Sequence, residues 1–150
     1  MGILKKKKDK KNVERSYDMP IMNYQRKEDD LLVQVHMLEA RDLAKPGMIK
    51  AKNDAYMCVY VANEVQPREK TNVIKKSRSP SWDETKDVYV ENFTQTKKRM
   101  SVRFEVYNYN KDSPHDFLGQ TTINFSQHPE LKNASGKWIE RWLPLEKRTS

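Results

Sequence analysis

The stretch "MSVRFEVYNYNKDSPHDFLG", from Met100 to Gly119, decides the fold that we expect for this chain. Its first seven residues alternate between apolar and polar side chains, which is typical of a β-strand with one buried face. The strand runs into Asn108, a tyrosine and Asn110, and Asp116 follows six residues later. This is the layout of a cation-binding loop with two amides where two carboxylates would be expected. The stretch is therefore a metal site, a site that has lost its ligands, or only a loop.

Other segments repeat the strand pattern along the chain. Prolines fall between these segments, as expected because proline cannot donate a hydrogen bond to a strand ladder. We also expect one short helical turn within residues 126–136. Short strands separated by turn residues predict an all-β, antiparallel sandwich. The predicted strands cover residues 31–38, 55–61, 71–74, 88–90, 100–106, 119–125 and 138–145, with a weaker eighth at 19–25.

The composition describes a water-soluble chain with a modest core. The chain has 150 residues, of which 33% are charged and 36% are hydrophobic, enough for one domain. No apolar run approaches the roughly 20 residues that a membrane-spanning helix needs, and no secretory signal is visible. The single cysteine, Cys58, fits a reducing compartment, and we expect it to be a small buried residue in mid-strand. These features predict a cytoplasmic protein.

The net charge of +8 is concentrated near the N-terminus. Residues 1–15 contribute +5 of it, so the other 135 residues carry +3. We therefore predict a basic arm at residues 1–28 and a folded domain at residues 29–150. Such an arm attracts acidic lipid, nucleic acid or acidic protein, or serves only to keep the chain soluble. Its first lysines are Lys5, Lys6, Lys7 and Lys8.

Four motifs occur in order along the chain: "LLVQVHMLEARDL", "NDAYMCVYV", "KTNVIKKSRSPSWDE" and "VRFEVYNYNKDSPHDFLG". With the closing "RWLPL", they resemble the C2-domain family, the β-sandwich modules of protein kinase C and synaptotagmins, over about residues 31–145. The resemblance implies a C2-like antiparallel β-sandwich of about eight strands. It also implies two four-stranded sheets, with three apical loops at one end.

In calcium-binding members of this family, five aspartates of the apical loops hold the ion, because Ca²⁺ takes about 6–8 oxygen ligands. The neighbouring Lys50 and Lys52 would repel a cation. We therefore expect no metal and no other cofactor, and we expect the two remaining aspartates to cap loop backbone instead. Carried over position by position, the five places fall at Met48, Asp54, Asn108, Asn110 and Asp116.

A second group of residues indicates an anion-binding surface. In some C2 domains, lysines on the concave strands hold phosphoinositide headgroups. Lys70 matches such a position, although Asn72 replaces its usual partner. The alternative is an ordinary solvated strand face whose charges protect an edge. The predicted surface comprises Arg68, Lys70, Lys75, Lys76 and Arg78, with Tyr56 and Tyr107 near the groove.

Nothing in the sequence indicates catalysis, since the three histidines are dispersed and the four glycines form no phosphate-binding loop. We expect a non-catalytic, calcium-independent docking module that attaches to an acidic surface, either anionic membrane lipid or an acidic protein. The alternative is a structural adaptor in a larger assembly, for example cytoskeletal or ciliary, with no lipid binding. Nucleic acid is not an expected partner, because charge alone supports it. Both functions place the protein peripheral to a membrane or to the cytoskeleton.

Overall fold

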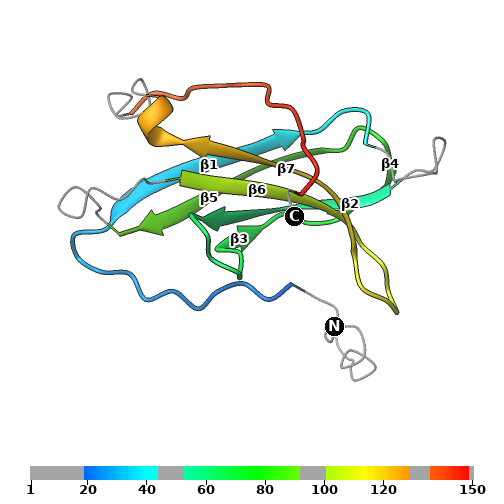
Figure 1. Ribbon diagram of the computed structural model, residues 1–150, viewed down its shortest axis with the longest axis horizontal. Coiled ribbons are helices and arrows are strands. Elements are labelled where there is room, and N and C mark those ends of the chain that lie inside the picture. The colour runs from blue at the N-terminus through cyan, green and yellow to red at the C-terminus, as the bar shows by residue number, and fades with distance from the viewer. Residues whose placement is uncertain (1–18, 44–52, 92–100, 129–135, 149–150) are drawn as a thin grey trace, which may run out of the picture.

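The computed structural model describes residues 19–43, 53–91, 101–128 and 136–148. In these residues the regular secondary structure consists almost entirely of antiparallel strands, which confirms the predicted all-β class (Figure 1). A two-stranded sheet has the order β1-β5, and a five-stranded sheet has the order β3-β2-β6-β7, with β4 also paired to β2. The strands are β1 (Leu31–Glu39), β2 (Asn53–Val61), β3 (Glu69–Lys70), β4 (Ile74–Ser77), β5 (Ser81–Val90), β6 (Ser101–Asn108) and β7 (Asp116–Asn124).

The space between the two sheets holds the main core. Alternation along each strand places one set of apolar side chains there, because successive residues of a strand point to opposite faces. Trp82 is buried beside this core, and its indole N–H donates to the carbonyl of Ala55 at 3.1 Å. Burial of each core valine contributes roughly 1.5–3 kcal/mol to folding. The core includes Val35, Met37, Val59, Val61, Val88, Val90, Val102 and Phe125, with Ala55 and Val106 in an adjoining cluster.

The outer face of the five-stranded sheet is also closed. The side chains of Tyr56, Cys58, Tyr60 and Tyr107 form a second buried cluster on this face. Residues 19–30, which we call the strap, run beside β3 before entering β1 (Figure 1). Cys58 is fully buried, as predicted, and burial raises the pKa of its thiol to about 12.

Several predicted elements differ from the structure. Residues 138–145 do not form a strand, and the nearest pairing is an isolated bridge between Gln120 and Glu146. The alternation is present there, but Pro144 lacks an N–H. Trp138 meets the ring of His36 on β1 edge-on, and Trp142 lies under the guanidinium of Arg41, so these side chains make contacts without extending a strand ladder. The predicted strand at 19–25 is irregular backbone, which the N–H of Met22 joins to the carbonyl of Pro67 just before β3.

The remaining boundaries moved by a few residues. The strand predicted at 71–74 overlaps β4 only at Ile74, and the one predicted at 88–90 is the end of the longer β5. The helical turn is a 3-10 turn at Phe125–Gln127. The structure has one sheet of two strands and one of five, whereas two sheets of four were expected. The difference arises because residues 138–145 do not pair as a strand and because β3 and β4 both pair with β2.

Candidate functional site

The loop site lies where β2, β6 and β7 meet at one end of the sandwich. Asn108 ends β6 and pairs in register with Asp116, the first residue of β7. Ala55, the residue after Asp54, pairs with Asn108 from the other side. The strand pairing therefore brings together four of the five positions that the resemblance implied. The fifth, Met48, lies outside the described residues.

The two amides of this site have defined orientations. The backbone N–H of Asp54 donates to Oδ1 of Asn108 at 2.8 Å, so the amide nitrogen of Asn108 must point the other way. That nitrogen donates to Oδ2 of Asp116 and to Oδ1 of Asn110, both at 3.1 Å. The amide nitrogen of Asn110 donates to the carbonyl of Pro114 at 2.8 Å and to the same Asp116 oxygen at 3.1 Å.

This donor set does not fit a calcium ion. Ca²⁺ needs oxygen atoms directed at it, whereas two N–H donors are directed at Asp116. Asp54 is engaged as well, since its Oδ1 accepts from the backbone N–H of Lys76 at 2.8 Å. Within the ranges that the structure describes, no group of three or more His, Cys, Asp or Glu side chains could hold a metal. Hydrogen bonds from the two amides to Asp116 join the ends of β6 and β7.

The predicted basic residues lie on or beside strands that flank β2. Lys75 and Lys76 are exposed on β4, and Arg78 is exposed directly after it. Lys70 lies on β3 opposite Cys58, and it is only half exposed. Its ammonium donates to the backbone carbonyl of Met19 in the strap at 3.0 Å. Lys5, Lys6, Lys7 and Lys8 lie outside the described residues.

Arg68 was predicted on the same surface, and this prediction is wrong. Its side chain is buried, with 6% exposure, and it forms two hydrogen bonds to the carboxylate of Glu64 at 2.8 and 2.9 Å. It also donates to the carbonyl of Tyr89, and its guanidinium carbon lies 3.8 Å from the ring centroid of Tyr24. Arg68 is therefore a buried side chain that joins the strap to the sheet, and it is not exposed to a ligand at the surface.

Tyr56 and Tyr107 are buried beneath the surface instead of lining it. Their rings stack with centroids 5.8 Å apart. Tyr107 donates to the carboxylate of Glu105 at 2.6 Å, and burial raises the pKa of its phenol. Tyr56 contacts His115 of the β6–β7 loop through its hydroxyl. Neither ring is placed to touch a bound headgroup directly, so both support the loop and sheet from below.

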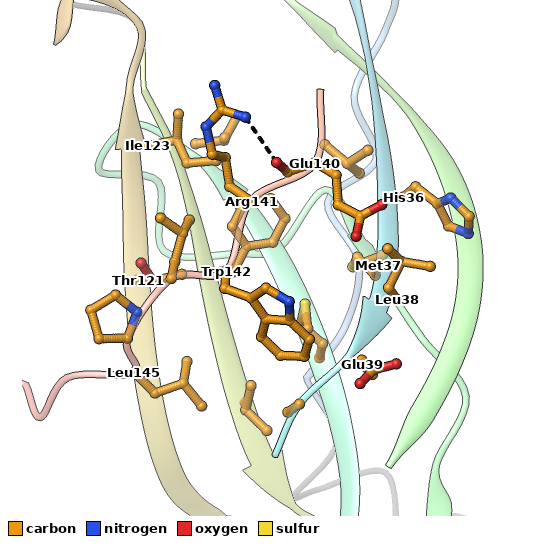
Figure 2. A pocket seen from close by; sticks show the side chains of 18 of the residues that line it. His36, Met37, Leu38, Glu39, Thr121, Ile123, Glu140, Arg141, Trp142 and Leu145 are labelled. Carbon is orange, nitrogen blue, oxygen red and sulfur yellow. Dashed lines mark hydrogen bonds between the residues drawn. The ribbon is translucent and has the colours of Figure 1, made fainter. Parts of the chain in front are cut away.

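The sequence did not reveal an apolar cavity of about 680 Å³ on the other side of the molecule. The cavity lies between β1 and the β6–β7 pair, and residues 138–145 cross it (Figure 2). Trp142 stands in the middle of this view, close to β1, and Arg41 stacks on its ring at 4.3 Å. Trp138 and Trp142 are 62% and 58% exposed. Of the predicted site residues that the structure describes, none lines this cavity.

Comparison with known proteins identifies the type of domain. The C2 domain family matches residues 31–145. Protein piccolo of Mus musculus is 28% identical over 126 residues, which cover 77% of this chain and 2% of that protein. Extended synaptotagmin-2-A of Xenopus laevis is 26% identical over 124 residues, covering 79% of this chain and 13% of that protein. The chain therefore spans only a small part of these relatives.

Solved structures show the same fold. A structure of the two C2 domains, A and B, of extended synaptotagmin 2 superposes with a TM-score of 0.61 at 21% identity, covering 86% of this chain and 41% of that one. The first C2 domain (domain A) of RIM from Drosophila gives a TM-score of 0.56 at 16% identity, covering 69% of this chain and 82% of that one. In the described residues, no helix is long and apolar enough to cross a bilayer.

Proposed function

This chain belongs to the C2 domain family, and from that premise we propose that it is a non-catalytic module that docks on anionic membranes without calcium. The observation that carries the proposal is the exposed cationic run Lys75, Lys76 and Arg78 at the loop end of the sandwich. None of these side chains forms an ion pair with another described residue. Their charge is therefore available to an acidic surface.

The magnitude of this attraction suits reversible, peripheral attachment. Each lysine or arginine near an anionic leaflet contributes about 1 kcal/mol, and the effect decays within a Debye length of about 8 Å at physiological salt. Three such side chains give weak binding by themselves. The basic segment at residues 1–15 adds +5 to the same chain. A module of this kind acts by placing itself, and whatever it carries, at an acidic membrane.

The calcium-independent part of the proposal is supported by the loop site. In calcium-binding C2 domains, aspartates of the apical loops hold the ion. Here amide nitrogens of Asn108 and Asn110 already donate to Asp116, so the loop carboxylate has hydrogen-bond donors without an ion. The neighbouring β4 cations bring positive charge to that end permanently.

Co-sedimentation with vesicles tests this function. The full chain is mixed with phosphatidylserine-containing vesicles or with phosphatidylcholine vesicles at physiological salt, in EDTA or in Ca²⁺. We expect binding to the anionic vesicles alone, and equally in both conditions. The variant Lys75→Glu/Lys76→Glu should bind at least about tenfold more weakly. The matched variant Lys137→Glu/Lys147→Glu makes the same change in net charge at exposed positions elsewhere.

The outcomes separate the components of the proposal. Equal losses in the two double variants would show that net charge, not the β4 surface, determines binding. Binding only with Ca²⁺ would contradict the account of Asn108 and Asn110. No binding to anionic vesicles in either condition would exclude the membrane function.

A structural adaptor without lipid binding is the second candidate, and a separate observation favours it. Trp138 and Trp142 are more than half exposed next to the apolar cavity. Exposed aromatic side chains are enriched at protein–protein interfaces. The double variant Trp138→Ala/Trp142→Ala would leave vesicle binding unchanged and abolish capture of protein partners if this function is correct.

A further inference from the structure

The strap covers the side of the sheet on which Lys70 lies. The carbonyl of Met19 accepts a hydrogen bond from the Lys70 ammonium, and the Met19 side chain packs against the cluster of Tyr56, Cys58, Tyr60 and Tyr107. The backbone N–H of Met22 donates to the carbonyl of Pro67 at 2.8 Å. The predicted headgroup lysine is therefore occupied by the chain's own backbone.

The contacts that the structure describes differ between the two parts of the strap. In its second half, Tyr24 stacks on Arg68, Arg26 lies 4.4 Å above the ring of Tyr89, and Lys27 pairs with Glu91 at 3.0 Å. The first half, residues 19–22, is held by the Met22–Pro67 and Lys70–Met19 hydrogen bonds and by the packing of Met19. Segments with few contacts open locally at low free-energy cost. Residues 19–22 are therefore the part of the strap that we expect to open first.

The chemistry at Lys70 favours replacement of this cover by an anion. An ammonium group has three donors and a full charge, and a neutral peptide carbonyl satisfies one donor without compensating the charge. Hydrogen bonds between an ammonium and a phosphate oxygen are shorter and roughly twice as strong as neutral ones. Lys75, on β4, is a second exposed cation beside β2. A phosphate that reaches Lys70 would thus outcompete the carbonyl of Met19.

We propose that residues 19–22 are an autoinhibitory cover over Lys70, and that a phosphomonoester of an anionic lipid headgroup displaces Met19 from the Lys70 ammonium. This inference rests on the proposed membrane function, and it adds that binding at Lys70 requires the cover to open. Wild-type affinity for a headgroup is lowered by the cost of opening, so any change that loosens residues 19–22 strengthens binding.

Substitution of Met22 by proline tests the cover in the full chain. Proline removes the N–H that donates to Pro67 and leaves the contacts of Tyr24, Arg26 and Lys27 untouched. We expect the Kd for inositol trisphosphate, measured by calorimetry in EDTA, to fall about fivefold, the effect of one net backbone hydrogen bond. Adding Lys70→Ala should abolish the gain. The matched control is Asn23→Pro, whose backbone N–H donates no hydrogen bond to a described residue.

A second pair of variants tests the cover in the opposite direction. Met19→Glu places a carboxylate beside Lys70 and should weaken trisphosphate binding more than Ile21→Glu, which makes the same charge change at an exposed position. Unchanged affinity in Met22→Pro with equal losses in the two glutamate variants would overturn the cover. A gain that persists in Lys70→Ala would also overturn it.

The arms of the experiment distinguish the two proposals and the two sources of phosphate. Anionic vesicle binding by the wild type with no response to Met22→Pro would refute the cover and leave the docking function intact. No binding to vesicles and none to trisphosphate in any variant would refute both. A response to soluble trisphosphate, but none to vesicles that contain phosphoinositide, would assign the site to a free phosphate compound and contradict the headgroup.

Discussion

At the scale of single residues, Asn108 and Asn110 decide the chemistry of the loop end. Each differs from aspartate by one nitrogen atom, and that atom turns an acceptor into a donor. Because the Asp54 N–H binds Oδ1 of Asn108, the donor side of this amide is turned toward Asp116. The loop is therefore held by hydrogen bonds between side chains where a calcium-binding C2 domain uses an ion.

The double substitution Asn108→Asp/Asn110→Asp should make the loop depend on an ion in place of the amide hydrogen bonds. It removes the donors to Asp116 and Pro114 and gathers three carboxylates at one point. We expect a loss of about 3 kcal/mol in the free energy of unfolding in EDTA, because four hydrogen bonds are lost, two of them to the Asp116 carboxylate. Millimolar Ca²⁺ should restore much of this stability.

Thermal unfolding in EDTA and in Ca²⁺ measures the effect. Asn23→Asp/Asn72→Asp is the control, since both side chains are exposed and lie outside the loop site. A rise in the Tm of the wild-type protein at micromolar Ca²⁺ would contradict the proposed calcium independence.

At the scale of secondary-structure elements, β7 controls how the C-terminal segment meets the sheet. Gly119 is buried on this strand, and a Cβ atom there would lie 2.8 Å from the Cβ of Leu145. The absence of a side chain lets residues 145–146 approach closely enough for the two backbone hydrogen bonds between Gln120 and Glu146, at 2.9 and 2.7 Å. This contact positions the end of the segment that crosses the apolar cavity.

The substitution Gly119→Ala should therefore destabilise the domain by roughly 1–3 kcal/mol, because the new methyl group collides with Leu145 and forces the segment outward. Urea unfolding of the single variant and of the same change in a Leu145→Gly background measures the coupling. The cost should be smaller where the Leu145 Cβ is absent. An equal cost in both backgrounds would show that the collision is not the cause.

At the scale of the whole molecule, the two ends of the described chain close the outer face of the large sheet. Met19 packs on one part of the tyrosine cluster, and the guanidinium of Arg148 lies 4.3 Å from the ring of Phe117 on the other. Burial is the main cause of the raised pKa values of Cys58, Tyr60 and Tyr107, and it also raises the pKa of Tyr24 to about 12. The folded state thus keeps these four groups protonated in mildly alkaline solution.

Stability should consequently fall as the pH rises above 9 and continue to fall toward pH 12. The unfolded chain loses these protons near the ordinary values of 9.0 for the thiol and 10.0 for the phenols, whereas the folded chain retains them. The unfolded state then binds fewer protons than the folded state, so the free energy of unfolding decreases as the pH rises. The stabilisation from these four groups is fully present only at a pH below their pKa values in the unfolded chain. Urea unfolding at pH 8, 10 and 11 measures the free energy of unfolding, and tyrosinate absorbance reports the ionisation of the phenols. A constant stability across that range would contradict the closed outer face.

Much of the fold could be predicted because it depends on local periodicity. The alternation at residues 100–106 predicted β6, and the spacing from Asn108 to Asp116 placed both residues at one end of a hairpin, since antiparallel strands joined by a short loop must pair there. Residues 138–145 have the same alternation without being a strand. A pattern of side chains shows which face is apolar, but not whether a neighbouring backbone is available for pairing.

The sequence by itself determined the all-β antiparallel class, because short-range alternation and turn residues suffice for it, and the spacing along one hairpin placed Asn108 and Asp116 at the same end. The grouping of Asp54 with them was implied by the resemblance to C2 domains, and the long-range β2–β6 pairing produces it. Only the tertiary structure decided which basic side chains are accessible to an acidic ligand. Arg68 lies inside because Tyr24, 44 residues earlier, stacks on it, and Lys70 is covered because Met19 reaches it from 51 residues away. Contacts across such separations depend on how the strap packs on the sheet, and no local pattern encodes them.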